Sequence, residues 1–349
     1  MAAQSDALTE SLDLAALPKA ELHMHFESSL RAETAREWSE RYGLPMPQKG
    51  QFEGLGQFVI AYEAARDLVR SCDDLERAAA ELVEDASAQG VVWSEVHLIP
   101  PTYGGRLGPE EGIVEAVLSG FALGAGRAGA AGRPSSAAII LGINRGLGLE
   151  AAERSLQLAV RYADHGVVGL GLAGDEANHP PSAFTGLFQR AREAGLRALP
   201  HAGEGAGAEN VRACIEQLGA SRICHGVRAV EDPTVVQLLL EHDVTLDVCP
   251  SSNVSLQVSP SLEQHQLRAL LKAGVSVSLN SDGPLFSGAT INDEYRLAHE
   301  RIGVSRVALA DIARNSIHAS SCPQPIRSTA IRGVKDWGRR RAEKGDAIP

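Results

Sequence analysis

The amino-acid sequence predicts a single (β/α)8 barrel. Short apolar runs alternate with longer segments of helical periodicity, and this alternation occurs eight times. The residues best suited to chemistry lie where the short runs end. Alternation of this kind is typical of a parallel sheet with crossover helices, and eight repeats favour a closed barrel over an open sheet. No phosphate-binding G-x-G-x-x-G follows the first strand, which argues against a dinucleotide-binding fold.

Each predicted strand is a run of four to eight mostly apolar residues bounded by polar or glycine-rich turns, as expected for buried parallel strands. In order, the predicted strands are 20–26, 91–98, 136–143, 166–172, 197–201, 223–225, 245–248 and 276–280. Segments between them have helical spacing of apolar residues. The clearest of these are 75–88, 149–163, 181–194, 208–218, 234–241 and 262–271.

The interval 27–90, between the first two predicted strands, interrupts the alternation. It contains Trp38, Phe52, Phe58 and Tyr62, partly in helical spacing. These aromatic residues could pack in the core, or the long segment could form a lid over the mouth of the barrel. The stretch 120–134 is rich in glycine and alanine, which predicts the end of a helix followed by a flexible turn.

The chain has 349 residues, a length that single barrels commonly reach. We therefore expect one domain spanning 1–349, with 1–15 and 335–349 frayed. We see no internal repeat, low-complexity region or linker.

Composition excludes several classes of function. The net charge is −11, and the one basic run, 339–341, is a three-residue stretch near the C-terminus. A nucleic-acid or membrane-surface partner is therefore not expected. No apolar stretch approaches the length of a membrane span, and residues 1–12 do not resemble a signal peptide. The five cysteines are odd in number and form no C-x-x-C, which favours a reduced, cytoplasmic enzyme.

Three of the predicted strands end in potential metal ligands. His23 and His25 are two residues apart, so in a strand both imidazoles point to one face. His201 ends the fifth strand, and Asp282 follows the eighth. In a barrel these strand ends meet at one rim. Imidazoles with one carboxylate suit Zn²⁺, with Fe²⁺ or Mn²⁺ as substitutes, so we predict one zinc ion per chain.

Residues near the predicted ligands could complete a hydrolytic site. A metal lowers the pKa of bound water from about 15.7 to near 7, and Asp282 could accept the proton of that water. His225, at the end of the sixth strand, could orient the hydroxide or stabilise charge, and Glu204 could protonate a ring nitrogen or a leaving group. This chemistry fits displacement of an amino group from a heteroaromatic ring, but it equally fits hydrolysis of an amide, a lactone or a phosphoester.

Six segments together resemble the adenosine/adenine deaminase family of metal-dependent hydrolases. The resemblance runs in order from about residue 18 to 325, and the combination is far more specific than any single motif. The segments are Pro18-Lys19-Ala20-Glu21-Leu22-His23-Met24-His25, Gly171-Leu172-Ala173-Gly174-Asp175-Glu176, His201-Ala202-Gly203-Glu204, His225-Gly226, Asp247-Val248-Cys249-Pro250-Ser251-Ser252-Asn253 and Ser278-Leu279-Asn280-Ser281-Asp282.

The resemblance implies hydrolytic deamination of a purine, with zinc held by His23, His25, His201 and Asp282. It also implies roles for five further positions. Glu204 would donate a proton to N1, His225 would assist the hydroxide, and Gly174 would meet the purine through its backbone. Glu27 falls where the family places an acidic residue that influences sugar or base selection, and Gly283 falls in the substrate-binding motif.

The chain departs from the family at two positions. The family usually carries Asp-Asp-Pro where this chain has Asp282-Gly283-Pro284, and its second aspartate normally hydrogen-bonds the purine N7. The family also favours glycine soon after its first acidic residue, where this chain has Ser28 and Ser29 after Glu27. Gly283 would suit a modified purine or a ring without an N7 acceptor. Alternatively, another residue or a water molecule supplies that contact.

The predicted function is zinc-dependent deamination of an adenine-containing nucleoside or base, with release of ammonia. Three alternatives stay open: a 5′-modified or specialised purine substrate, another hydrolase of the same superfamily, and a non-catalytic purine-binding barrel. His97 and Tyr103 could line the substrate pocket or serve as packing residues, and His265 has no predicted role. The expected partner is a small purine, and the sequence makes no prediction of oligomeric state.

Overall fold

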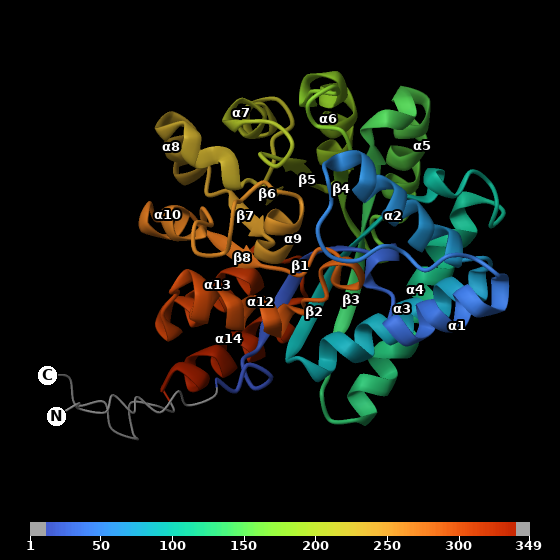
Figure 1. Ribbon diagram of the computed structural model, residues 1–349, viewed down its shortest axis with the longest axis horizontal. Helices are drawn as coiled ribbons and strands as arrows, with labels where there is room; N and C mark the ends of the chain where they lie inside the picture. Colours follow the sequence, from blue (N-terminus) through green and yellow to red (C-terminus); the bar gives the residue numbers. More distant parts are fainter. Residues whose placement is uncertain (1–11, 340–349) are drawn as a thin grey trace, which may run out of the picture.

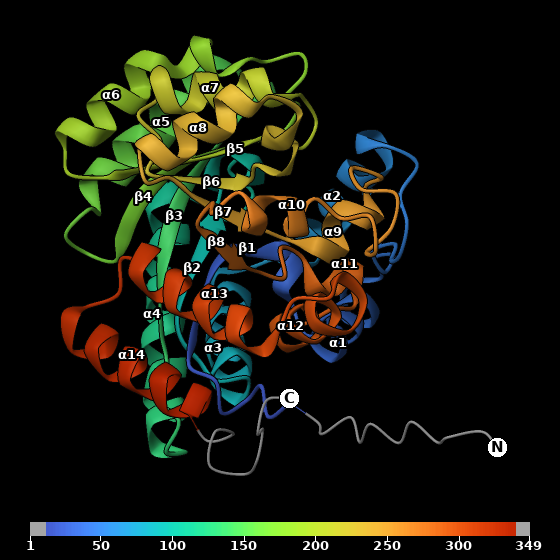
Figure 2. The ribbon, with the colours of Figure 1, turned by 90° about the vertical axis from the view of Figure 1, so that its left-hand side faces the viewer.

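The computed structural model describes residues 12–339 and is a (β/α)8 barrel. Eight parallel strands follow one another around the barrel in sequence order, β1 to β8. Helices surround them, as Figures 1 and 2 show. The predicted fold class is confirmed.

The elements alternate as expected. The strands are β1 (Lys19–His25), β2 (Val91–Leu98), β3 (Ser136–Asn144), β4 (Val167–Ala173), β5 (Arg197–Ala202), β6 (Arg222–His225), β7 (Thr245–Val248) and β8 (Val277–Leu279). The helices are α1 (Ala32–Tyr42), α2 (Leu55–Leu68), α3 (Cys72–Ala88), α4 (Glu110–Ala130), α5 (Gly148–Arg161), α6 (Thr185–Glu193), α7 (Ala208–Glu216), α8 (Pro233–Glu241), α9 (Pro250–Ser255), α10 (Leu267–Lys272), α11 (Pro284–Ser287), α12 (Ile291–Leu297), α13 (Arg306–Ala319) and α14 (Gln324–Arg339). All eight predicted strands are confirmed, with ends within one residue.

A bulge in β1 separates its two halves. Glu21 pairs with Ser94 of β2 and Met24 pairs with Val96, so β1 uses three steps where β2 uses two. A bulge of this kind changes the direction in which the following side chains point. It comes just before the end of the strand, where the two predicted metal-binding histidines lie.

The barrel closes where its first and last strands meet. β1 and β8 share no continuous ladder, and the link between them is an isolated bridge from Met24 to Asp282. Around it, the His25 amide donates to the Asp282 carbonyl at 3.0 Å, and the Asp282 amide donates to the His23 carbonyl at 3.1 Å. The Leu22 amide also donates to the side chain of Asn280 at 2.7 Å. The seam is therefore held at the same place as the predicted site.

A buried ion-pair network lies inside the barrel and links four of its strands. Arg222 donates to Glu95 at 2.8 Å and to Asp247 at 2.5 Å, and all three side chains are fully buried. The Ser278 hydroxyl donates to the other oxygen of Asp247 at 2.6 Å. Such a network joins β2, β6, β7 and β8 beneath the rim.

Close packing between α3 and α4 explains the glycine-rich stretch near residue 120. A Cβ atom at Gly120 would lie 2.3 Å from the carbonyl oxygen of Glu76, and one at Gly124 would lie 2.5 Å from that of Ala80. Glycine here allows two helices to touch, so α4 continues to Ala130 and only then turns. By length and composition alone α4 could cross a membrane, but here it packs against α3 and β3.

The interval 27–90 folds into three helices. Trp38 of α1 and Phe52 are buried in the core. Phe58 and Tyr62 of α2 instead line a pocket at the mouth of the barrel. The expectation of core packing is therefore confirmed for Trp38 and Phe52, while α2 contributes Phe58 and Tyr62 to the pocket lining.

The two ends of the described chain contact each other. The Trp337 indole, buried on α14, donates to the main-chain oxygen of Asp13 at 2.8 Å. Leu14 is also buried. Leu14 and Trp337 therefore pack against the rest of the protein, whereas Asp13, Lys335 and Asp336 are exposed. The rest of the predicted frayed ends, 1–11 and 340–349, lies outside the described residues.

Candidate active site

The structure brings together the four predicted metal ligands at the rim formed by the C-terminal ends of the strands. Nε2 of His201 lies 3.1 Å from Nε2 of His23 and 3.1 Å from Nε2 of His25. Oδ1 of Asp282 lies 3.5 Å from Nε2 of His23 and 3.4 Å from Nε2 of His25. Four potential ligand atoms from β1, β5 and the end of β8 thus converge on one point.

These distances fit a tetrahedral metal ion. Zinc–nitrogen bonds of about 2.0–2.1 Å in a tetrahedron place the ligand atoms roughly 3.3 Å apart. The observed separations of 3.1–3.5 Å bracket that value. His23, His25, His201 and Asp282 could therefore hold one ion.

The protonation of the cluster also suits metal binding. Burial lowers the pKa of both His23 and His25 to about 4, so both are neutral at pH 7. Nδ1 of His23 lies 3.2 Å from the carbonyl oxygen of Asp247, which can only accept. Nδ1 must therefore carry the proton, and the lone pair on Nε2 faces the cluster. Burial opposes ionisation of Asp282, but the facing His23 and His25 outweigh it and lower its pKa to about 2.

Glu204 lies beside the cluster on a loop that a second carboxylate holds in place. Glu176 accepts hydrogen bonds from the main-chain amides of four successive residues, 203–206, at 2.7–3.1 Å. Burial, followed by the charges of Asp282 and Glu176, raises the pKa of Glu204 well above its usual range. One Glu204 oxygen, Oε1, has no hydrogen-bond partner among the described residues. A protonated carboxyl held at a fixed position in a pocket can act as a general acid.

His225 and Asp282 both have left-handed backbone conformations, with φ of 63° and 60°. Such angles are uncommon for residues other than glycine and are often found at functional sites. Nε2 of His225 lies 3.2 Å from Oε1 of Glu204. Burial lowers the pKa of His225 to about 4, so this imidazole is also neutral.

A pocket of about 790 Å³ opens over the cluster. Its lining combines polar residues at the rim with apolar residues of α2 and the neighbouring loops: His25, Phe58, Val59, Tyr62, Glu63, Arg66, Ile99, Thr102, Asn144, Ala173, Gly174, His201, Glu204, His225, Leu256 and Asp282. Gly174 has φ of 97°, and a Cβ atom there would lie 3.1 Å from the Asn144 side chain. Glycine therefore leaves its main chain open to the pocket.

Glu27 lies behind this pocket and is not among the residues that line it. Its carboxylate accepts a hydrogen bond from the Tyr62 hydroxyl at 2.5 Å and from the Tyr103 hydroxyl at 2.7 Å. All three side chains are largely buried, and Tyr62 also contacts the ring of His25. His97, fully buried, stacks on His25 with ring centroids 5.0 Å apart. His97 and Tyr103 are packing residues beneath the pocket.

Gly283 faces Ser28 across the seam. A Cβ atom at Gly283 would lie 2.9 Å from both Cβ and Oγ of Ser28, closer than such atoms approach in real proteins, and 3.2 Å from Phe286. The Ser28 hydroxyl is buried and donates to the carbonyl oxygen of His25 at 3.1 Å. The two departures from the family pattern therefore occupy the same space.

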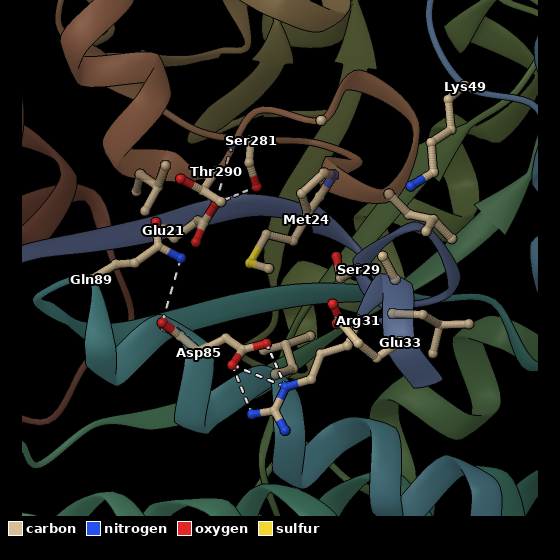
Figure 3. Close-up of a pocket in the computed structure, with 18 residues that line it drawn as sticks. Glu21, Met24, Ser29, Arg31, Glu33, Lys49, Asp85, Gln89, Ser281 and Thr290 are labelled. Atoms are coloured by element: carbon tan, nitrogen blue, oxygen red, sulfur yellow. Dashed lines mark hydrogen bonds and ion pairs between the residues drawn. The ribbon is translucent and has the colours of Figure 1, made fainter. Parts of the chain in front are cut away.

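A second, larger pocket of about 970 Å³ lies between β1 and the helices that cover it. Figure 3 shows its lining, which includes Glu21, Met24 and the Arg31–Asp85 ion pair. Glu21 accepts hydrogen bonds from the amide and the hydroxyl of Ser281, at 3.1 and 2.5 Å. This pocket contains no histidine, and its contact with the site is indirect, through the residue that precedes Asp282.

Sequence reasoning missed several supporting residues. Glu176, Arg222 and Glu95 were not singled out, and Asn253 was noted only as part of a motif. A signal existed for Glu176, which belongs to the segment that contains Gly174. Asn253 likewise belongs to a motif, whereas no local signal marks Arg222 and Glu95, because their partners lie on distant strands.

Comparison with known proteins places the site in context. The family model described as adenosine deaminase matches residues 18–337. An adenine deaminase of Vibrio parahaemolyticus is 35% identical over 333 residues, covering 92% of this chain and 96% of the relative. An adenosine deaminase of Shewanella loihica is 32% identical and covers 86% and 93%. The crystal structure of adenine deaminase from Arthrobacter aurescens superposes with a TM-score of 0.85 at 30% identity, covering 93% of this chain and 99% of that one.

Proposed function

The chain belongs to the adenosine deaminase family, whose members hydrolyse C–N bonds of adenine-type substrates, and on that premise we propose that it is a zinc-dependent deaminase of an adenine nucleoside or base. The observation that carries the proposal is the convergence of His23, His25, His201 and Asp282 within 3.1–3.5 Å, beside the partly buried Glu204.

The site residues would have separate roles in the reaction. Glu204, kept protonated by burial, would donate its proton to N1 as water attacks C6. Asp282 would accept a proton from the attacking water and pass it to the departing amino group, so that ammonia leaves, and the remaining hydroxyl proton would return to Glu204 as the C6 carbonyl forms. His225 would stabilise the charge that develops on the attacking oxygen. Gly174 would contact the purine through its main chain, and Glu27 would support the pocket wall through Tyr62.

Zinc, when bound, would supply hydroxide at neutral pH by lowering the pKa of water from about 15.7 to near 7. We propose one ion per chain. A cytoplasmic location and a small-molecule substrate fit the five free cysteines and the acidic net charge.

The direct test is ammonia release from adenine, adenosine and 2′-deoxyadenosine by zinc-loaded protein. Replacing Glu204 with glutamine should lower kcat by about 100- to 10,000-fold, the usual contribution of a general acid, without loss of zinc. Zinc content of both proteins is the control. Turnover that survives in E204Q, or absence of turnover on all substrates by zinc-replete wild type, would overturn the proposal.

A second candidate substrate class follows from Arg66, the one arginine or lysine among the described residues that line the pocket. Its guanidinium lies 3.7 Å from Glu63 and 3.8 Å from Asp67, beyond hydrogen-bond distance, and both carboxylates are about half exposed. It donates no hydrogen bond to any residue in the described part of the chain. A cation in such a position is available to bind an anionic group of a substrate.

The geometry suggests which part of the substrate Arg66 would meet. Tyr62 lies one helical turn earlier on α2, and its ring centroid is 5.9 Å from that of His25. Arg66 is therefore about one turn, or 5.4 Å along the helix, from the residue that contacts His25, and it lines the same pocket. C6 and N9 are on opposite sides of a purine. With C6 at the metal, a substituent on N9 would extend toward Arg66, which favours a phosphate or carboxylate on that substituent.

The assay compares kcat/KM for adenosine, AMP and adenosine 5′-carboxylic acid. If Arg66 binds the anion, R66M should lower kcat/KM for the preferred anionic substrate about 10- to 100-fold more than for adenosine, the usual effect of losing a hydrogen bond to a charged group. Arg70, exposed nearby and outside the pocket lining, provides the control variant R70M, which should change neither value. Equal losses on neutral and anionic substrates would reject this class.

A further inference from the structure

A chain of buried hydrogen bonds runs from a main-chain amide to His225. The amide of Leu267, at the start of α10, donates to Nδ1 of His265 at 3.0 Å. Nε2 of His265 lies 3.1 Å from Oδ1 of Asn253, and Nδ2 of Asn253 lies 3.2 Å from Nδ1 of His225. The side chains of His225, Asn253 and His265 are each at most 3% exposed.

The donor and the acceptor in every hydrogen bond of this series follow from the first bond. A main-chain amide can only donate, so Nδ1 of His265 is an acceptor. In a neutral imidazole the other nitrogen then carries the proton and donates to Asn253. The Asn253 oxygen is therefore the acceptor, and its NH₂ group must face Nδ1 of His225. That nitrogen accepts in turn, which leaves the proton of His225 on Nε2, the atom that faces Glu204.

From this geometry we propose that Asn253 and His265 are positioning residues that hold His225 in the Nε2–H tautomer. His225 then acts as a hydrogen-bond donor toward the attacking oxygen, rather than as a base or a further metal ligand. The inference rests on the proposed function for its catalytic consequence, but the tautomer itself does not depend on turnover.

The alternative tautomer would change what His225 can do. His225 lies with His23 and His201 in a group whose potential ligand atoms are within 4.8 Å of one another. With a lone pair on Nε2, His225 could join the metal ligands or remove a proton from water. With the proton on Nε2 it can do neither, and His225 can act there only as a hydrogen-bond donor.

Main-chain hydrogen bonds fix the position of Asn253, and the first turn of α10 fixes that of the Leu267 amide. The Asn253 amide donates to the Cys249 carbonyl at 2.9 Å, and the Ser259 amide donates to the Asn253 carbonyl at 3.0 Å. The Leu267 amide belongs to the first turn of α10, where it has no partner within the helix. His265 satisfies that amide, and the same contact sets its own tautomer.

The test combines NMR with kinetics on the zinc-loaded full-length protein. Histidine labelled with ¹⁵N reports the tautomer of each ring through its two nitrogen shifts, and among the 11 histidines the His225 signals are those lost in H225Q. Wild type should show His225 protonated on Nε2. N253D places a carboxylate against Nδ1, which should move the proton of His225 to that nitrogen.

The kinetic expectation distinguishes this role from a purely structural one. N253D should lower kcat by about 100-fold or more, as losing a preorganised donor or reversing a catalytic histidine does, while KM changes far less. H265L should permit both tautomers and lower kcat, and H265Q, whose amide can still donate to Asn253, should restore both properties. Thermal unfolding of each variant shows whether it is folded.

Two results would overturn the inference: a wild-type His225 that is protonated on Nδ1, or an H265L protein with unchanged tautomer and kcat. Failure of the proposed function looks different. In that case no adenine compound is deaminated, while the tautomer of His225 and its response to N253D are as expected.

Discussion

Replacing Gly283 with aspartate should harm the protein unless Ser28 is replaced with glycine at the same time. A Cβ atom at residue 283 would lie 2.9 Å from Cβ and Oγ of Ser28, and both residues lie in the seam between β1 and β8. Overpacking of this kind costs about 1–3 kcal/mol, and a carboxylate buried there without a partner costs more. S28G alone loses the hydrogen bond to the His25 carbonyl, worth about 1 kcal/mol.

The two changes together should therefore be less harmful than the sum of their separate effects. We expect a coupling free energy of at least about 1 kcal/mol in a double-mutant cycle, measured by chemical unfolding of zinc-loaded protein. By the resemblance to the deaminase family, the new carboxyl would contact N7 of the purine. It would have to donate to that nitrogen, and burial favours the protonated form that can do so.

Kinetics with two substrates separate the N7 contact from a general effect. The double variant S28G/G283D should gain about 10- to 100-fold in kcat/KM for adenosine, the value of one buried hydrogen bond. It should gain nothing for 7-deazaadenosine, which lacks the N7 acceptor. If G283D alone is as stable as wild type and as active on adenosine as the double variant, then Ser28 does not crowd residue 283 and the reasoning is wrong.

Three other predictions concern the metal, pH and the core. D282N should lower bound zinc below one ion per chain by elemental analysis, and zinc should restore activity to chelated wild type but not to D282N. For metal-free protein, His23 and His25, with pKa values lowered to about 4, should make the free energy of unfolding fall as the pH decreases from about 6.5 to 4, because unfolded histidines bind protons in that range while these two do not; a flat profile over that range in urea titrations would contradict this. E95Q, which leaves the buried Arg222 without its full pairing, should lower the free energy of unfolding by about 3–5 kcal/mol, whereas E263Q, at an exposed ion pair, should leave it unchanged.

The strands were predictable because each is a local apolar run, and a closed barrel brings their ends to one rim whatever the detail of packing. The positions of His23, His25, His201 and Asp282 follow from that topology, so their convergence could be expected from sequence.

Contacts between loops could not be predicted in the same way. Four amides of residues 203–206 bind Glu176, and His265 reaches His225 through Asn253. Neither arrangement has a periodicity, because loop conformations depend on neighbours far away in sequence. The helix predicted at 262–271 begins at Leu267 for a similar reason: its first turn is fixed by His265 rather than by apolar spacing.

The crowding of Gly283 by Ser28 is a further example. Each residue alone looks like a departure from a family pattern, and only the backbone distance between them reveals that one accommodates the other. The single substitution G283D, designed from the sequence alone, would therefore crowd Ser28 and would not isolate the effect of the new carboxylate.

The seam between β1 and β8 has a consequence for biosynthesis. Asn280 follows Leu22 by 258 residues, yet their contact helps to join the first strand to the last. While the protein is being made, His23 and His25 leave the ribosome long before Asp282 does. With the proposed ligand set, a nascent chain would have only part of the ligands, so high affinity for the metal would arise only when the eighth strand has been released and has docked beside the first. Metal uptake would then mark a chain whose barrel has closed, and products truncated before Asp282 would leave the ribosome without the ion.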